Sequence, residues 1–504
     1  MARQAVSTRR LPGRAPHRGP GGGMEAKGDH DGGKESPAPE AVVARTVIGD
    51  WAFRTKSSVM HLAWFTGLEI PDLIKTRVPV PALRLFHRPG AYGPYICAGA
   101  VMVMVAFGHD VIAPAKADDR TQVRLAVDHL IAAQLPSGLF SYDFDFLKDD
   151  RTGEDHIVRQ AAAANVLAEY YLHTKDERMR PAIEAALKAF GEMSLPIGKR
   201  TAQTALERIG LLSVPIGRYK LRATLDWFGL LYRPDGTGKV VSGDEEYGRA
   251  HTGATALALL TELEYFRASG DKRFADLRRA WLEGLMSLHI AGRGFRYSPE
   301  VIDEEAYYNG ESWLALAYYN DVFPQDQATA AVLSQVDDYL MEKYADSRRS
   351  PRTQFFHWGA MAALVRFTTT SDRKFSDFAR EQARHFLDAL RPKLDPDRNS
   401  CALVEGLAAA AAVLIASRDD DTALLKRIQE RIGEEMTKNR GLQIRPGQQR
   451  LELGGDVSLL APHLSEYAGA FLAGAYSPMT RIDLTQHCIS AMIKLERYGL
   501  DSAE

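Results

Sequence analysis

The sequence predicts an all-α fold in which six helical hairpins close into a ring, an (α/α)6 toroid. Three observations predict it. From residue 121 onward, apolar residues recur every three or four positions, and strand-like alternation is almost absent. The predicted helices alternate between an amphipathic type and a type that is apolar on nearly every face. Short turns follow the second type and longer connections follow most of the first, as in stacked hairpins.

The two helix types predict two concentric layers. Helices with a charged side are expected to face water, and helices that are apolar nearly all round are expected to be buried. The predicted outer helices are 121–134, 177–193, 273–290, 326–345, 375–390 and 422–438. The predicted inner helices are 156–173, 250–268, 305–320, 354–370, 399–417 and 481–498.

The composition is that of a globular protein and excludes several function classes. The chain has 504 residues, of which 45% are hydrophobic and 25% are charged. A net charge of −2 gives no general reason to bind nucleic acid, so no nucleic-acid partner is expected. Three cysteines are too few for a disulfide framework. No Walker, GxSxG or GxGxxG motif occurs in a suitable context, and we expect no cofactor.

Three regions follow from these patterns. Residues 1–45 are rich in Gly, Pro, Ala and Arg and lack apolar periodicity, which predicts a disordered segment. Residues 46–117 form a poorly defined N-terminal region, and residues 118–504 form the predicted barrel domain. Within the N-terminal region, residues 95–108 carry no charge but fall short of the roughly 20 residues that a membrane span needs. We therefore expect no stable membrane span.

The apolar segment 95–108 has the length of a signal-peptide core. Arg84, His87 and Arg88 precede it, and residues 115–117 (Ala-Lys-Ala) follow as a small-x-small cleavage pattern. If residues 95–117 act as a signal segment, the protein is periplasmic or secreted and its mature form begins near Asp118. Otherwise the segment is a buried or interfacial helix and the protein is cytoplasmic.

Residues 306–311 (Ala-Tyr-Tyr-Asn-Gly-Glu) open a predicted inner helix and resemble the Tyr-Tyr-x-Gly-Glu helix starts of glucuronyl-epimerase-like barrels. Together with the six hairpins, roughly residues 120–498 resemble the (α/α)6-toroid superfamily of six-hairpin glycosidases, sugar epimerases and polysaccharide lyases. The resemblance implies a glycan-acting enzyme: a glycoside hydrolase, a polysaccharide lyase or a uronate epimerase. Its partner would be an oligo- or polysaccharide. Fold alone does not fix function.

Two other functions are compatible with the same fold. One is a zinc- or terpenoid-type toroid with an apolar pocket, and the other is a non-catalytic helical scaffold that binds polysaccharide or protein. For the glycan-acting enzyme, the expected site is a funnel formed by the long loops at the N-termini of the inner helices, where binding residues concentrate. The free N–H groups and dipoles of those helix starts favour anionic ligands.

The carboxylates and histidines near these helix starts are candidates for acid–base chemistry on a sugar, which needs a proton donor and an acceptor. Two aspartates of the run GLFSYDFDF point the same way if that loop is extended. Glu311 lies within the predicted apolar helix that begins at residue 305. Burying an ionised carboxylate without a partner is costly, so Glu311 should be either paired or functional. The candidate catalytic residues are Asp143, Asp145, Glu311, His357 and Asp483. For His357, a hydrogen-bonded core histidine is the alternative.

Aromatic and basic residues of the funnel are candidates for substrate binding. Aromatic rings suit the C–H faces of sugars, and arginines suit the carboxylate of a uronate. Each aromatic residue has an alternative role in the core, and each arginine has one in a helix-to-loop salt bridge. The candidate substrate-binding residues are Phe140, Tyr142, Arg159, His251, Tyr297, Tyr308, Trp358 and Arg481.

One further set has metal-ligand chemistry. Cys401 and Glu405 are four residues apart on one inner helix, and Asp483 and His487 are four apart on the next, so each pair shares a helix face. Cys, Asp and His are zinc ligands, and the toroidal protein prenyltransferases use such a trio. The alternative is a buried thiol beside ordinary hydrogen-bonded pairs. We expect no bound metal, and these four residues are the set that would hold zinc if one were present.

Overall fold

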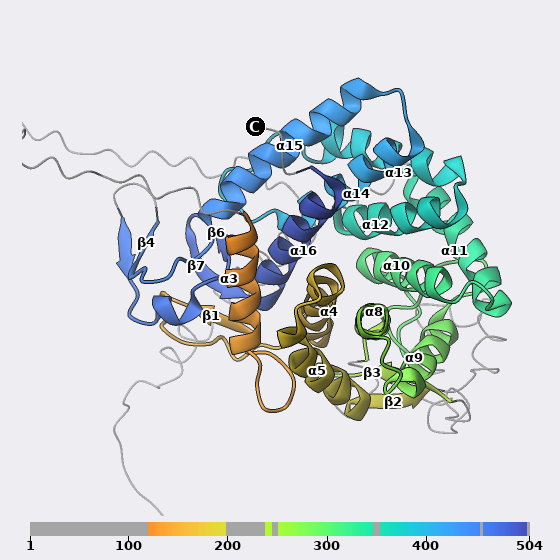
Figure 1. Ribbon diagram of the computed structural model, residues 1–504, viewed down its shortest axis with the longest axis horizontal. Coiled ribbons are helices and arrows are strands. Elements are labelled where there is room, and N and C mark those ends of the chain that lie inside the picture. Colours follow the sequence, from red (N-terminus) through yellow and green to blue (C-terminus); the bar gives the residue numbers. More distant parts are fainter. Residues whose placement is uncertain (1–118, 198–236, 244–249, 346–352, 454–456, 501–504) are drawn as a thin grey trace, which may run out of the picture. The chain divides into compact units, whose positions relative to one another are not determined.

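Six helices line the centre of a closed ring (Figure 1). They are α4 (Ile157–Thr174), α8 (Thr252–Ser269), α10 (Ala306–Val322), α12 (Thr353–Thr370), α14 (Cys401–Ser417) and α16 (Ile482–Tyr498). Each inner helix packs against the next, and α16 packs against α4, so the ring is closed. Their composition accounts for this position, because helices that are apolar on all sides are excluded from water. In α8, for example, every residue from Thr252 to Tyr265 is buried.

The computed structural model describes residues 119–197, 237–243, 250–345, 353–453 and 457–500. All of them belong to one compact unit, Tyr92–Glu504. The expectations for residues 1–45, 46–117 and the signal-like segment 95–108 lie outside the described residues. Among the helices that are described, none is both long and apolar enough to cross a membrane.

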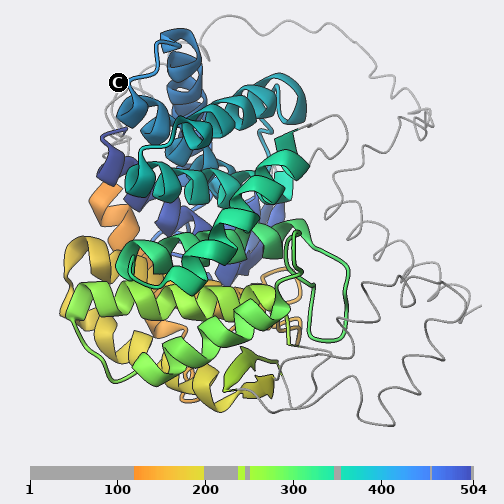
Figure 2. The ribbon, with the colours of Figure 1, turned by 90° about the vertical axis from the view of Figure 1, so that its right-hand side faces the viewer.

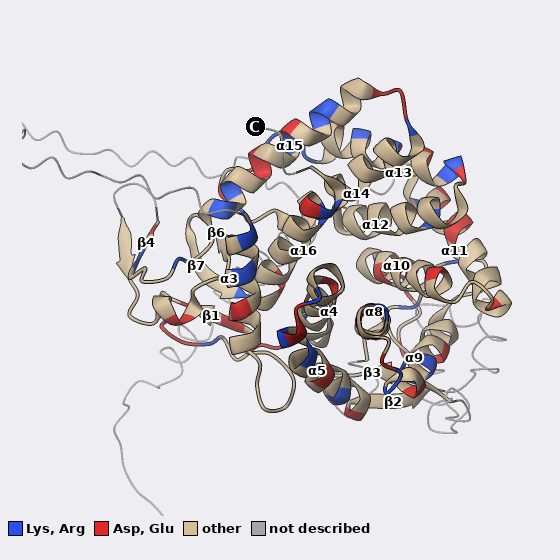
Figure 3. Cartoon of the chain, viewed as in Figure 1, with Lys and Arg blue, Asp and Glu red and all other residues tan. Residues whose placement is uncertain are grey.

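Six outer helices surround the inner ring. They are α3 (Asp119–Ala132), α5 (Arg180–Glu192), α9 (Ala275–Leu288), α11 (Gln327–Ala345), α13 (Arg373–His385) and α15 (Thr422–Gly441). Each packs on one or two inner helices through its apolar side. Figure 3 shows the charged residues concentrated on outer helices such as α5, α11 and α15, while inner helices such as α8 are mostly uncharged. The predicted (α/α)6 toroid of six hairpins is confirmed.

Short turns connect each inner helix to the next outer helix. Lys175, Gly270 and Arg418 end α4, α8 and α14 in the left-handed conformation, with φ of 58°, 72° and 54°. The chain then reverses, and Asp372 and Asp421 cap α13 and α15 through their side chains. Because all inner helices run in the same direction, they begin at one face of the ring, which we call the mouth. Figure 2 shows the connection between α9 and α10 and the strands before α8 at this end of the helices.

Short strands occur in the longer connections, where the sequence predicted almost none. A three-stranded antiparallel sheet has the order β1 (Asp143–Asp145), β7 (Ser477–Arg481), β6 (Leu472–Gly474). Two further pairs join β2 (Ser194–Ile197) to β3 (Gly238–Val241) and β4 (Arg450–Glu452) to β5 (Ser458–Leu460). Short helices occur at η1 (Glu177–Met179), η4 (Phe386–Leu390) and η5 (Leu464–Tyr467). The stretch Asp143–Asp145 is extended in β1.

The first and last parts of the described chain lie side by side. Asp143 of β1 pairs with Arg481 of β7, which immediately precedes α16. At the other end of the same helices, a guanidinium nitrogen of Arg120 lies 2.8 Å from Oε1 of Glu496. The sheet therefore places the connection before α4 beside the connection before α16, on one side of the mouth.

Candidate functional site

Four inner helices each present a titratable side chain in their second turn. Glu311 is the sixth residue of α10, His357 the fifth of α12, Glu405 the fifth of α14 and His487 the sixth of α16. Because these helices are parallel and consecutive in the ring, the four side chains lie at the same depth below the mouth. Glu311, His357 and Glu405 are only 1–3% exposed. The ring thus places four titratable groups near the starts of consecutive inner helices.

Glu311 is a buried carboxyl group with an unsatisfied oxygen. Its Oε2 atom has no hydrogen-bond partner among the described residues. Burial, with a smaller contribution from the Glu305 carboxylate, raises the pKa of Glu311 to about 8. Glu311 is therefore protonated at neutral pH and has a proton to donate.

His487 and Glu405 form a hydrogen-bonded pair across α16 and α14. Nδ1 of His487 lies 2.9 Å from Oε2 of Glu405. Burial alone lowers the pKa of His487, but the Glu405 carboxylate outweighs burial and holds the pKa above its ordinary value. His357 lies beside this pair, with its ring centroid 5.5 Å from that of His487. The three residues are called the His–Glu–His cluster below.

His357 differs from an ordinary core histidine. It is 1% exposed, and neither of its ring nitrogens has a hydrogen-bond partner among the described residues. Burial, together with His487 and Lys494, lowers its pKa well below the ordinary value. The alternative considered from the sequence, a hydrogen-bonded core histidine, is therefore wrong. A buried, unpaired imidazole is costly unless a ligand completes its bonding.

Asp483 is held by two arginines at the start of α16. Its two oxygens lie 2.6 and 2.9 Å from nitrogens of Arg481, and Oδ2 lies 3.1 Å from Nε of Arg159. Burial raises the pKa of Asp483, but the two arginines outweigh burial and hold it well below its usual range. Arg159 also donates to the hydroxyl of Tyr142. Asp483 is therefore an ionised group that positions Arg481 and Arg159, and it is poorly suited to accept a proton.

Aromatic rings also line the mouth at the starts of α4, α8 and α10. His251 stacks on His156 at a centroid distance of 5.0 Å and contacts Tyr297 at 5.2 Å and Tyr308 at 5.8 Å. Burial lowers the pKa of His156 to about 4 and also lowers that of His251. Both imidazoles are therefore neutral at pH 7. The predicted residues His251, Tyr297 and Tyr308 are brought together here.

Tyr307 and Trp358 connect this wall of rings to the His–Glu–His cluster. The ring of Tyr307 lies 5.8 Å from that of His357, and the ring of Trp358 lies 4.8 Å from it. Burial, with contributions from Asp483 and Glu311, raises the pKa of Tyr307 to about 12. Nε1 of Trp358 is a buried donor without a partner among the described residues. Trp358 therefore presents an unused N–H group beside the cluster.

Three sequence-predicted residues lie elsewhere. Asp143 anchors the loop after β1, because its oxygens accept hydrogen bonds from the backbone N–H and hydroxyl of Thr152. Asp145 accepts from the backbone N–H groups of an exposed turn and lies 3.3 Å from Nζ of Lys148. Phe140 is 1% exposed and belongs to the hydrophobic core, so its alternative role as a core residue applies.

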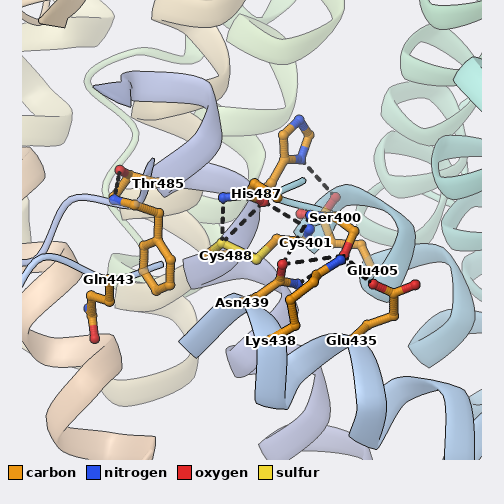
Figure 4. Close-up of a disulfide and its surroundings, with 12 residues drawn as sticks. Ser400, Cys401, Glu405, Glu435, Lys438, Asn439, Gln443, Thr485, His487 and Cys488 are labelled. Carbon is orange, nitrogen blue, oxygen red and sulfur yellow. Dashed lines mark hydrogen bonds and ion pairs between the residues drawn. A yellow bond between two sulfur atoms is a disulfide. The ribbon is translucent and has the colours of Figure 1, made fainter. Parts of the chain in front are cut away.

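Cys401 forms a disulfide with Cys488, which joins α14 to α16 at a Cα–Cα distance of 4.8 Å (Figure 4). The interpretation of Cys401 as a buried thiol is therefore wrong, and the sulfur is not available as a zinc ligand. Asp483, engaged by two arginines, also leaves the predicted metal set. Glu405 and His487 remain from that set and lie next to the disulfide.

Comparison with solved structures finds similar proteins. A GH76A alpha-1,6-mannanase from Salegentibacter sp. HEL1_6 has 11% sequence identity and a TM-score of 0.50, covering 76% of this chain and 100% of that chain. The fold is a six-hairpin toroid. A sugar epimerase from a ruminal bacterium has 12% identity and a TM-score of 0.44, with 74% of this chain and 97% of that chain covered. An unsaturated glucuronyl hydrolase from Bacillus sp. GL1 has 14% identity and a TM-score of 0.46, with 75% and 97% covered.

At 11% sequence identity, the likeness to the mannanase shows a common fold and assigns no function to any residue of the mouth. No protein-family model and no curated protein matches the chain. The resemblance to six-hairpin glycosidase-like barrels is confirmed at the level of fold.

Two mouth residues, His156 and Tyr307, were not predicted from the sequence. His156 and His251 are the N-cap residues of α4 and α8, but only His251 was predicted. Tyr307 lies at the predicted helix start 306–311 but is not among the candidate substrate-binding residues. Both omissions had a usable signal, because a polar or aromatic residue within one turn of any inner helix start must lie at the mouth. The association of His357 with Glu405 and His487 could not be predicted in this way, because it depends on which helices are neighbours in the ring.

Proposed function

We propose that this protein is an acid–base enzyme that acts on an oligo- or polysaccharide at the mouth of the toroid. The observation that carries the proposal is a concentration of buried, unpartnered polar atoms around one set of opposed acid–base groups. Among the described residues, these atoms belong to His156, His251, Glu311, His357 and Trp358. Buried polar groups without partners are rare in proteins, and a site that binds a polar ligand accounts for them.

Glu311 is the proposed proton donor. With its pKa raised to about 8, it carries a proton at neutral pH that an ordinary glutamate would have lost. Protonation of a leaving oxygen or of a carbanion is the step that such a group supplies in glycoside hydrolysis, β-elimination and epimerisation.

The proposed proton acceptor is the His487–Glu405 pair. Glu405 fixes the orientation of the imidazole through the 2.9 Å contact and stabilises the imidazolium that forms when His487 takes a proton. The donor and acceptor lie on α10 and α16, at the same depth and with His357 of α12 between the two helices in ring order. We propose that the sugar ring lies between the protonated carboxyl group of Glu311 and the basic imidazole of His487.

The surrounding residues favour a sugar, and an acidic one in particular. Tyr297, Tyr308 and Trp358 offer ring faces and polar edges, as expected for the alternating C–H and hydroxyl surfaces of a saccharide. Arg159 and Arg481, positioned by Asp483, provide guanidinium groups for a uronate carboxylate. The polar lining argues against the alternative of an apolar terpenoid pocket.

A substrate screen tests the proposal. The full-length protein is incubated with neutral and uronate-containing polysaccharides, while reducing ends, ultraviolet absorbance of unsaturated products and epimer composition are measured. We expect turnover in one of these assays and its loss, by about 10²–10⁴-fold, in Glu311→Gln. Glu342→Gln, an exposed glutamate on the outer helix α11, is the matched control and should retain activity. Saccharide binding without turnover would instead indicate the non-catalytic scaffold.

A further inference from the structure

The His–Glu–His cluster has the composition and spacing of a metal site. His357, Glu405 and His487 come from the consecutive inner helices α12, α14 and α16, and their candidate ligand atoms all lie within 4.8 Å of one another. We propose that these three side chains bind a divalent transition-metal ion at the base of the mouth, with Zn²⁺ as the ion that fits best.

His357 supplies an observation that is independent of the clustering. It is 1% exposed, it faces His487, and neither ring nitrogen has a hydrogen-bond partner within the described part of the chain. A metal ion provides the partner that this imidazole lacks. The strongly lowered pKa keeps the ring neutral, which is the form that binds metals.

Glu405 and His487 complete the ligand set with one negative charge. Their 2.9 Å contact holds a proton in the metal-free protein, and a metal ion would take its place and release it. The nearby charges are already balanced by other partners. Lys494 lies 2.6 Å from Oε1 of Glu169, and Asp483 is paired with arginines as described above. The carboxylate of Glu405 is thus the charge that remains to neutralise a cation.

Two imidazoles, one carboxylate and an open position form the usual ligand set of a catalytic zinc ion. With zinc–ligand bonds of about 2.0–2.2 Å, the ligand atoms must lie closer together than the 4.8 Å limit, so zinc binding requires a rotation of these side chains. The side chain of His487 is 18% exposed, so the cluster is not sealed from solvent on the α16 side. This inference deepens the proposed function. Only its catalytic consequence rests on the proposed function: a water molecule on the zinc would replace His487 as the proton acceptor.

Metal binding to the full-length protein tests the inference without any assay of activity. The protein is stripped with a chelator, dialysed and titrated with Zn²⁺ alone by calorimetry, and bound metal is counted by mass spectrometry. We expect one equivalent of Zn²⁺. His357→Gln, Glu405→Gln and His487→Gln should each weaken binding by about 10–100-fold or more. His251→Gln is the matched control, because it alters a half-buried mouth histidine outside the cluster and should leave zinc affinity unchanged.

Co²⁺ provides a second readout on wild-type protein. Co²⁺ in the site should show the intense visible bands of a low-coordinate complex, and added Zn²⁺ should abolish them. Absence of stoichiometric Zn²⁺ and of these bands in folded wild-type protein would overturn the inference, as would unchanged zinc affinity in folded His357→Gln. Chelator-resistant turnover by zinc-free protein would refute the catalytic consequence and leave the proposed function intact. Stoichiometric zinc without turnover of any saccharide would support the metal site and count against the proposed function.

Discussion

Glu311 on α10 lies against the backbone of α8 at Gly253. A Cβ atom on Gly253 would come within 2.0 Å of Oε2 of Glu311 and 2.7 Å of a ring carbon of Tyr308. A residue without a side chain is therefore needed on α8 for the carboxyl group and the tyrosine ring to occupy their positions. The unpartnered oxygen of Glu311 depends on this close approach.

Gly253→Ala should displace Glu311 and lower turnover by about 100-fold, since small misplacements of a catalytic group have large effects. Overpacking should also lower the free energy of unfolding by about 1–3 kcal/mol. Gly433→Ala is the matched control, because nothing lies within 4 Å of a Cβ at this exposed position of α15. It should raise stability by about 0.5–1 kcal/mol without affecting turnover. Urea unfolding and initial rates check both variants, and wild-type rates in Gly253→Ala would contradict the proposed role of Glu311.

The pH dependence of turnover should reveal the raised pKa of Glu311. A proton donor is active while protonated, so kcat/KM should fall as the pH rises through about 8. Glu305 contributes to this pKa through its negative charge, and Glu305→Gln should move the alkaline limb to lower pH. Rates measured between pH 5 and 10 give the limb for both proteins. A limb that stays in place would show that Glu305 does not act on the titrating group.

Asp483→Asn should destabilise the protein at neutral pH, by about 2–4 kcal/mol, because it removes the counter-charge from two partly buried arginines. The pKa of Asp483 is depressed in the folded state, so its contribution is present above the unfolded pKa of about 4. That contribution is lost as the pH falls through the folded-state pKa. The stability difference between wild type and variant should therefore shrink in acid. Urea unfolding at several pH values checks this, with Asp145→Asn at an exposed turn as the control.

Reduction of the Cys401–Cys488 disulfide should lower stability by about 2–5 kcal/mol, because the bond closes a loop with a sequence separation of 87 residues. Unfolding in the presence and absence of dithiothreitol measures the effect. The double variant Cys401→Ser/Cys488→Ser should be as unstable as the reduced wild type and should not respond to dithiothreitol. If dithiothreitol destabilised the double variant, the loss of stability would not come from this disulfide.

The repeat of two helix types made the toroid predictable. Apolar spacing of three and four is a local property of the chain, so all twelve helices could be placed from sequence to within a few residues. The strands were missed because segments such as β1 and β6 have only three residues, too short for an alternating pattern. Their pairing also joins connections that are far apart in the sequence, such as those of Asp143 and Arg481.

The candidate site was only partly predictable, because shared helix faces do not specify partners. The four-residue spacing placed Glu405 with Cys401 and His487 with Asp483 on one face of each helix, and the structure joins Glu405 to His487. It could not show that Cys401 bonds to Cys488 or that Arg159 and Arg481 engage Asp483. Those two interactions remove half of the predicted metal set, and His357 joins the remaining pair from a third helix.

The closure of the ring between α16 and α4 means that no hairpin is structurally the first. The start of α3 and the end of α16 are held together by Arg120 and Glu496, so a short linker can join Leu500 to Asp119. A circularly permuted chain that begins at the turn Ser371–Asp372 would keep every pair of neighbouring helices. The contacts between neighbouring helices therefore do not depend on which hairpin comes first along the polypeptide.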